Sequence, residues 1–158
     1  MRKEDPVAIN DSLSAPTPRT LPDLTDAATR FPVRPGEDPW TDQEVQEIAA
    51  ELVAEIDRLT SELAAADEGL SELLRNSGDG AGDDQADSGS SALEREHELT
   101  LVNNTRDMLE QSNRALARMD AGTFGRCDSC GEAIGKARVQ AFPRATLCVA
   151  CKQREERR

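Results

Sequence analysis

The amino-acid sequence predicts a mostly α-helical protein: an antiparallel two-helix coiled-coil hairpin with an acidic loop at its tip, followed by a small four-cysteine module. Three observations support this fold class. An unbroken heptad pattern begins after Trp40, a second amphipathic stretch follows a Gly- and Asp-rich segment, and all four cysteines lie in the last 32 residues. Only 3% of the 158 residues are aromatic and 32% are charged, which leaves too little apolar mass to line a deep pocket. We therefore expect no enzyme.

Residues 1–39 hold seven of the eight prolines in the chain. Proline removes backbone donors and blocks helix formation, so this segment is predicted to be disordered. A solvated tail is the preferred interpretation, and a short docking motif for a partner is the alternative. The apolar residues that such a motif would use are Leu21, Leu24, Phe31 and Val33.

The hairpin is predicted over residues 40–122, and its first helix begins directly after Trp40. Thr41 and Glu44 form a capping box, and Trp40 and Val45 occupy the positions of a hydrophobic staple. An apolar seam then alternates steps of four and three residues, which is the period of a coiled coil. The seam comprises Val45, Ala49, Leu52, Ile56, Leu59, Leu63, Ala66, Leu70 and Leu73.

A Gly- and Asp-rich stretch predicts that the first helix ends near Asn76 and that a tip loop covers about residues 76–91. The second helix is expected to start at a capping box formed by Ser91 and Glu94 and to end at Gly122. Its seam is weaker, because Thr105 and Ser112 interrupt it. The apolar positions assigned to it are Leu93, Leu99, Val102, Leu109, Leu116 and Met119.

The module over residues 123–158 contains the pattern C-x2-C-x17-C-x2-C and ends in a basic helix. This spacing is typical of a structural zinc site, since four thiolates complete a tetrahedral shell and leave no open position for water. Gly131 supplies the permissive backbone that the first knuckle needs. Two disulfides, a redox-active pair and an iron–sulfur cluster are the competing interpretations, and one structural Zn2+ is preferred. Its ligands would be Cys127, Cys130, Cys148 and Cys151.

Charge is distributed unevenly along the chain. The formal net charge is −12, yet residues 121–158 carry eight basic and four acidic side chains. The overall acidity argues against nucleic acid or an anionic membrane as the partner of the whole chain. The single histidine, His97, lies in a run of charged residues and is expected to be solvated.

The acidic tip has two interpretations. Asp and Gly are common in solvated turns, and composition alone favours that interpretation. Alternatively, the rod delivers carboxylates to a cationic or metal-bearing site in a partner.

A coiled-coil hairpin with an acidic tip, followed by F-G-x-C-x-x-C-G and a second C-x-x-C-K, resembles the TraR/DksA family of bacterial RNA polymerase-binding factors. The resemblance covers roughly residues 40–158 and is most specific from Thr123 to Lys152. It implies a factor whose hairpin enters the secondary channel of RNA polymerase and thereby modulates initiation. The tip motif of the family, D-x-x-D-x-A, is matched by Asp84 and Asp87, whereas Gly89 stands where the family has alanine.

The resemblance also implies a site for guanosine tetraphosphate, bound between factor and polymerase through basic residues near the zinc module. Lys152 matches one such position, but Gln111 and Phe142 occupy two others. Neither a neutral amide nor an apolar ring replaces a charge-assisted bond to phosphate, so nucleotide synergy is predicted to be weak or absent.

The sequence thus predicts a monomeric, cytoplasmic, non-catalytic transcription regulator that binds RNA polymerase, without sequence-specific nucleic-acid or membrane binding. Its apolar runs are too short for a membrane span, and no targeting segment is recognised. The alternative is a nucleic-acid-binding zinc module with a dimerising coiled coil.

Overall fold

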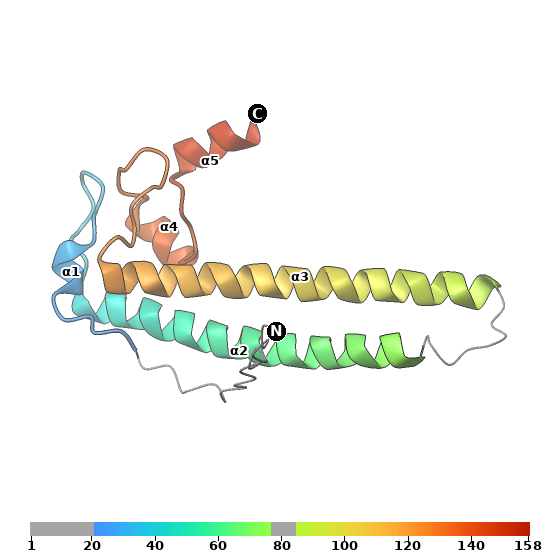
Figure 1. Cartoon of the computed structure of the whole chain (residues 1–158). Helices are drawn as coiled ribbons and strands as arrows, with labels where there is room; N and C mark the ends of the chain where they lie inside the picture. Colours follow the sequence, from blue (N-terminus) through green and yellow to red (C-terminus); the bar gives the residue numbers. More distant parts are fainter. Residues whose placement is uncertain (1–20, 77–84) are drawn as a thin grey trace, which may run out of the picture.

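The computed structural model of the chain describes residues 21–76 and 85–158. Its main feature is a rod of two antiparallel helices, α2 (Asp42–Asn76) and α3 (Gln85–Ala121), which pack along each other (Figure 1). Three short helices gather at the base of the rod, at the end opposite the α2–α3 connection. These helices are α1 (Ala27–Arg30), α4 (Lys136–Ala141) and α5 (Val149–Glu156). The predicted helical hairpin and the small four-cysteine module are both confirmed.

Helix α2 begins and ends where the sequence predicts. The Thr41 N–H donates to Glu44 Oε2 at 2.9 Å, and the Glu44 N–H donates to Thr41 Oγ1 at 3.2 Å, so the capping box is formed. Trp40 and Val45, the two staple residues, are both buried. Helix α2 ends at Asn76, before the Gly- and Asp-rich stretch.

Helix α3 begins earlier than predicted, so the expected loop over residues 76–91 is wrong for residues 85–91. The helix starts at Gln85 and runs through Gly89 and Ser91. Once a helix is nucleated, each further residue adds one hydrogen bond, and a single glycine costs only about 1 kcal/mol. At the other end, Gly122 has φ +74°, and the Thr123 N–H bonds to Arg118 O at 2.9 Å, which confirms the predicted glycine stop.

The seam between α2 and α3 is tight at the base and looser toward the tip. Val45, Ala49, Leu52, Ile56 and Leu59 are buried, as predicted. The later seam positions of α2 are only half-buried, and these are Leu63, Ala66, Leu70 and Leu73.

On α3 the predicted assignment of Leu93 and Leu99 to the seam is wrong, because these side chains are 68% and 47% exposed. The heptad that contains Val102 and Leu109 continues backward through Glu98 instead, and that side chain is less exposed than Leu99. Ser112 does lie in the seam and is fully buried. Its Oγ donates to Met108 O at 2.9 Å, so the buried hydroxyl is hydrogen-bonded within its own helix.

The predicted disorder of residues 1–39 is wrong for the described part of that segment. Residues 21–39 include α1, and Phe31 is only 5% exposed. Its ring packs on Phe124 of the module at a centroid distance of 5.3 Å and meets Trp40 edge-on at 6.4 Å. The prolines stop helix formation there, but enough apolar side chains remain between them to dock on the base. Residues 1–20 lie outside the described residues.

A single core therefore joins three parts of the chain. Its buried members are Ala27, Phe31, Trp40, Val45, Ile48, Ala49, Leu52, Ala115, Met119, Phe124, Cys127, Ile134, Val139 and Cys151. They come from residues 21–40, from the base of the rod and from the four-cysteine module. Within the described ranges, the helices contain no stretch that is long and apolar enough to cross a membrane.

Candidate metal centre

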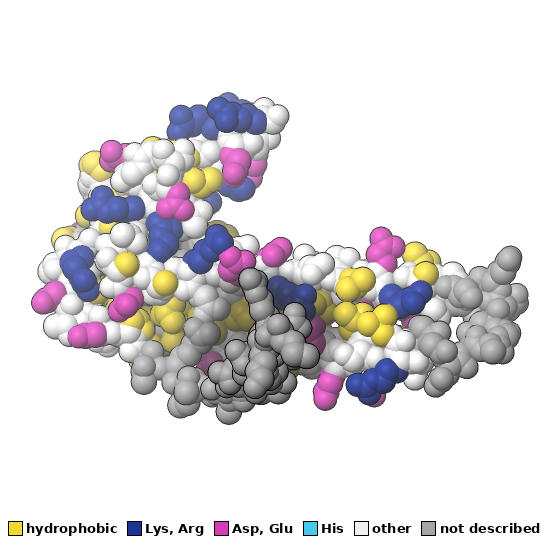
Figure 2. Space-filling view, viewed as in Figure 1, with side chains coloured by type: hydrophobic (Ala, Val, Ile, Leu, Met, Phe, Trp, Pro, Cys, Tyr) yellow, Lys and Arg dark blue, Asp and Glu magenta, His cyan; other side chains and the backbone are white. Residues whose placement is uncertain are grey.

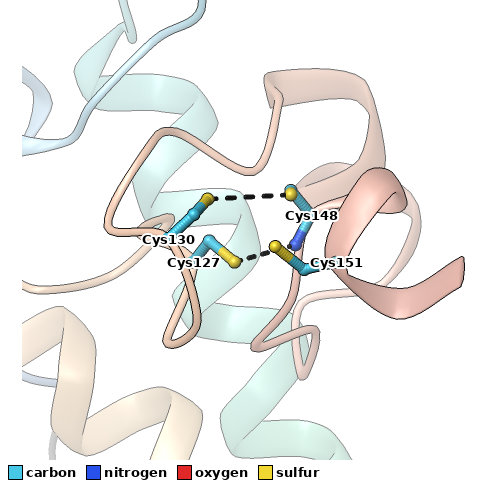
Figure 3. A group of neighbouring side chains, drawn as sticks. All are labelled: Cys127, Cys130, Cys148 and Cys151. Carbon is cyan, nitrogen blue, oxygen red and sulfur yellow. Dashed lines mark hydrogen bonds between the residues drawn. The ribbon is translucent and has the colours of Figure 1, made fainter. Parts of the chain in front are cut away.

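The four cysteines converge at one point of the module, although 17 residues separate the two pairs. Cys127 and Cys130 lie on a tight turn, Cys148 precedes α5, and Cys151 lies in the first turn of that helix. Their Sγ atoms all lie within 4.8 Å of one another (Figure 3). All four are free thiols, so the structure does not adopt the two-disulfide alternative.

Backbone hydrogen bonds shape the first cysteine pair. The Cys127 N–H donates to Glu132 O at 2.8 Å, and the Gly131 N–H donates to Cys127 O at 2.9 Å. Gly131 has φ +76°, a conformation that side chains with a Cβ rarely adopt, which confirms the role predicted for this glycine. An isolated antiparallel bridge between Arg126 and Ala133 closes the turn.

The residues fit a zinc ion. Zinc–sulfur bonds of about 2.3 Å in a tetrahedron place neighbouring sulfurs about 3.8 Å apart. The Sγ atoms of Cys130 and Cys148 are 3.9 Å apart. Four thiolates make a closed shell, which is the arrangement of a structural rather than a catalytic zinc site. The centre is therefore a C4 site for one structural zinc ion, as the sequence predicts.

Hydrogen bonds favour the thiolate form of two of the ligands. Burial raises the pKa of the Cys127 thiol, but N–H donors from Cys148, Cys130 and Ser129 outweigh burial and lower the pKa to about 6. The Cys148 N–H lies 3.3 Å from Cys127 Sγ. A hydrogen bond from Ser129, and after it one from Arg154, lowers the pKa of Cys151. The guanidinium of Arg154 lies 2.8 Å from Cys151 Sγ.

Cys130 behaves in the opposite way. The Glu132 N–H lowers the pKa of its thiol, but the three neighbouring cysteines and burial together raise it to about 11. Several negative sulfurs in so small a volume repel one another, so the last proton is held until a divalent cation replaces it. The site is consequently suited to a metal ion.

Ion pairs and hydrogen bonds fix the module on the base of the rod. Lys136 Nζ lies 2.7 Å from Glu44 Oε2, so the carboxylate that caps α2 also binds the module. On the other side, Arg118 of α3 contacts Asp128 at 3.3 Å and donates to the Arg126 carbonyl. The Lys136 bond is the largest cause of the lowered pKa of Glu44.

The other predicted site residues lie far from this centre or outside the described residues. Asp84 falls outside the described residues. Asp87 and Gly89 are part of the first turns of α3, at the far end of the rod from the module (Figure 1). Lys152 is on α5, where its Nζ lies 3.0 Å from Glu155 and 4.0 Å from Glu156.

Sequence reasoning missed two residues of this region. Arg154 donates to a metal ligand, and Glu37 accepts the N–H of Lys136 at 3.1 Å. The spacing of Arg154, three residues after Cys151 in a predicted helix, could have indicated the first contact. Nothing in the sequence links Glu37 to a residue 99 positions later.

A family profile described as the prokaryotic dksA/traR C4-type zinc finger matches residues 122–157. The match confirms the resemblance to the TraR/DksA family that the sequence motifs predict. A solved structure, that of transcription factor DksA2 from Pseudomonas aeruginosa, is 27% identical and has a TM-score of 0.60. The match covers 73% of this chain and 85% of that one. The fold expected of a TraR/DksA protein is thus confirmed over most of the described chain.

Named relatives match about half of the chain. The RNA polymerase-binding transcription factor DksA of Caulobacter vibrioides is 40% identical over 75 residues, which are 48% of this chain and 53% of the relative. The factor of the same name from Escherichia coli K12 is 38% identical over 63 residues, 39% of this chain and 42% of the relative. General stress protein 16O of Bacillus subtilis is 33% identical over 82 residues, 52% and 50% of the two chains. The chain thus spans about half the length of these relatives.

Proposed function

We propose that this protein is a non-catalytic transcription regulator that binds RNA polymerase and inserts its hairpin tip into the secondary channel. The observation that carries the proposal is the shape of the chain: a slender rod braced at one end by a zinc module. With about 1.5 Å of rise per residue, the 35 residues of α2 give a length of about 50 Å. The names of the relatives, RNA polymerase-binding transcription factors, supply the partner.

The rod is suited to entering a channel because its apolar seam is already used within the chain. Val102 and Met119 of α3 and Ile56 of α2 are buried inside the hairpin, so the base of the rod needs no second coiled coil. The zinc module, which is wider than the rod, would stay outside the channel. The tip residues Asp84, Asp87 and Gly89 would then approach the active centre of the polymerase.

The first experiment is binding of labelled, zinc-loaded protein to core RNA polymerase, in competition with a protein known to occupy the secondary channel. Saturable binding that the competitor removes is the expected result. Binding that survives competition would contradict the channel, and absence of binding at micromolar polymerase would contradict the partner.

A second experiment separates docking from action at the tip. The double variant Asp84→Ala, Asp87→Ala is expected to bind polymerase normally and to lose its effect on initiation. The double variant Asp79→Ala, Asp83→Ala removes the same charge from the same acidic stretch and serves as the control. Loss of binding in the first variant alone would make the two carboxylates docking groups and would contradict an action at the active centre.

Guanosine tetraphosphate is expected to add little. Lys152 is the basic residue that matches the nucleotide position of the family, and its ammonium is shared with Glu155 and Glu156. Phe142, at another such position, exposes 62% of an uncharged side chain. A promoter assay with and without the nucleotide tests this, and a several-fold enhancement would contradict it.

The alternative function, direct binding of nucleic acid by the zinc module, is favoured by one observation. Lys and Arg side chains gather over α5 (Figure 2). However, Arg154 is bonded to Cys151 and Lys152 to Glu155, so two of these cations are already engaged. We therefore expect a monomer with little affinity for DNA or RNA. Tight binding that falls steeply with salt, together with a dimer in solution, would instead favour the alternative.

A further inference from the structure

Residues 31–40, here called the strap, cross the module on their way from α1 to α2. The strap touches the module at Phe124 through Phe31 and at Gly125 through Pro32, whose Cδ lies 3.6 Å from a Cβ built on that glycine. The Trp40 Nε1–H donates to Pro32 O at 3.2 Å and so ties the two ends of the strap together. The strap is therefore a closed loop that leans on the module.

Glu37 holds the middle of this loop. Its Oε1 and Oε2 accept the Lys136 N–H at 3.1 and 3.2 Å, and Oε2 also accepts the Arg34 N–H at 2.9 Å. The Lys136 ammonium in turn donates to Pro39 O at 3.2 Å and lies 5.3 Å from the centre of the Trp40 ring. One carboxylate and one lysine thus connect the strap to the module by four contacts.

The strap faces the metal ligands across a cavity of about 630 Å³. Val33, Arg34 and Pro35 line it on the strap side, and Cys130 and Cys148 line it on the module side. Cys130 is exposed and lines this cavity, so a solute in the cavity can reach its sulfur. Cys151 borders a different hollow, but it is buried and its sulfur is bonded to Arg154.

We propose that the strap limits the access of metal-binding solutes to Cys130 and Cys148, with Glu37 as the latch that keeps it closed. A chelator removes zinc by bonding to the ion as the protein sulfurs leave, and so it must first reach the site. While Glu37 bonds to Lys136, a bulky chelator meets the wall formed by residues 33–35. The proposal concerns the rate of metal release and goes beyond the proposed binding to RNA polymerase, which its test does not use.

The test measures zinc release from the full-length, zinc-loaded chain to an excess of chelator. Glu37→Ala is expected to release zinc about tenfold faster, because it removes charge-assisted hydrogen bonds that hold the strap. Asp38→Ala is the matched control. Asp38 is the adjacent acidic residue, is exposed, and makes no hydrogen bond or ion pair with the rest of residues 21–76 and 85–158. Equal release rates for the two variants would overturn the proposal.

Comparing a large with a small chelator distinguishes restricted access past the strap from a general destabilisation of the module. The wild-type protein is expected to release zinc more slowly to EDTA linked to dextran than to the small planar chelator dipicolinate, and Glu37→Ala should narrow that ratio. If both rates rise by the same factor, the residue is only structural and the proposal is overturned. Should Glu37→Ala fail to retain zinc, Glu37→Gln, which keeps one acceptor oxygen, is compared with Asp38→Asn in the same way. An unchanged ratio in that pair would overturn the proposal as well.

Discussion

The base and the distal half of the rod are built from the same two helices but in different ways. At the base, residues 42–59 and 102–121, the seam is buried as far as Leu59 and Val102. Residues 45–52 and 115–119 of the base also belong to a core shared with the strap and the module. In the distal half, residues 60–76 and 85–101, seam residues such as Leu70 are half-buried, and Leu74, Leu99 and Leu101 are exposed. Figure 2 shows hydrophobic side chains on the surface of this half. Only the base therefore has an interior like that of a globular domain.

The difference shows how a chain of low aromatic content divides its apolar residues. All of the described aromatic side chains except Phe142 are buried at the base. Two helices that pack only on each other bury one face of each helix. At the base, the strap and the module form a third layer that covers the helices further and completes the core. The base can therefore hold a fixed geometry, and the distal half keeps apolar surface that a partner can cover.

The largest expected effect is loss of the metal centre through Cys127→Ser. A structural zinc ion supplies much of the folding free energy of a small module, on the order of 10 kcal/mol. We expect the variant to retain no stoichiometric zinc and to shift the fluorescence of Trp40, the single tryptophan, to the red, because that ring is buried and lies against Phe31 and Lys136.

Circular dichroism of the same variant checks the contrast between the two regions. Most of the helical signal should remain, since α2 and α3 pack on each other along the rod. Collapse of the whole helical signal would contradict the separation of base and distal half. Arg157→Ala, an exposed position that leaves in place all four ligands and the side chains that bond to them, is the control for metal content.

The second effect compares one seam residue from each region. Ile56 is fully buried, and Ile→Ala at such a site costs about 2–5 kcal/mol of unfolding free energy. Leu70 is half-buried, so Leu70→Ala should cost about half as much or less, because part of its side chain is already in water. Denaturant unfolding of the zinc-loaded proteins measures both, and equal losses would show that the distal half is packed as tightly as the base.

Much of this contrast could be predicted from the sequence. The heptad from Val45 to Leu73, the capping box at Thr41 and the stop at Gly122 are local signals, and each decides its element without help from distant residues. The ligand set follows from the spacing of the four cysteines, because that spacing reflects the geometry of a tetrahedral site.

What could not be predicted depends on contacts between distant residues. Phe31 lies in a proline-rich stretch of the sequence, and contacts with distant residues, such as its packing on Phe124, order the segment. The start of α3 at Gln85 reflects cooperative helix growth beyond the capping box at Ser91. Leu99 was assigned to the seam because it is apolar, but the heptad register, set by residues nearer the base, turns it outward.

The third effect concerns Arg154, which contacts the metal centre without being a ligand. Its guanidinium donates to Cys151 Sγ, and groups that bond to metal ligands typically change metal affinity by about 10- to 100-fold. We expect Arg154→Ala to bind zinc about tenfold more weakly in a competition titration. Arg157→Ala, which removes the same charge from the C-cap of α5, should leave zinc affinity unchanged. Equal zinc affinities of Arg154→Ala and the wild-type protein would mean that backbone N–H donors stabilise the thiolates without help from Arg154.

The smallest effects come from ion pairs, one in each region. Lys136–Glu44 at the base has side chains that are 14% and 27% exposed, while Arg106–Asp67, which links α3 to α2 in the distal half, has 54% and 46%. A pair as exposed as the second contributes about 0–1 kcal/mol, so Asp67→Asn should shift the melting temperature by no more than about 1–2 °C. Glu44→Gln should lower it more, because the capping box, Lys136 and Gln140 all use that carboxylate.

The pH dependence of the Glu44 effect distinguishes a charge contact from simple packing. The Lys136 bond, followed by that from Thr41, holds the pKa of Glu44 below its usual value of 4.5. A carboxyl group whose pKa is lowered by folding stabilises the protein at every pH above its unfolded pKa, and this contribution is lost as the pH falls through the folded pKa. The deficit of Glu44→Gln should therefore stay constant from pH 8 to pH 5.5, measured on protein whose bound zinc is verified at each pH. If the stability difference between Glu44→Gln and the wild-type protein shrinks across that range, Glu44 takes up a proton in the folded protein. The charge of the Glu44 carboxylate would then not be what holds the module to the rod.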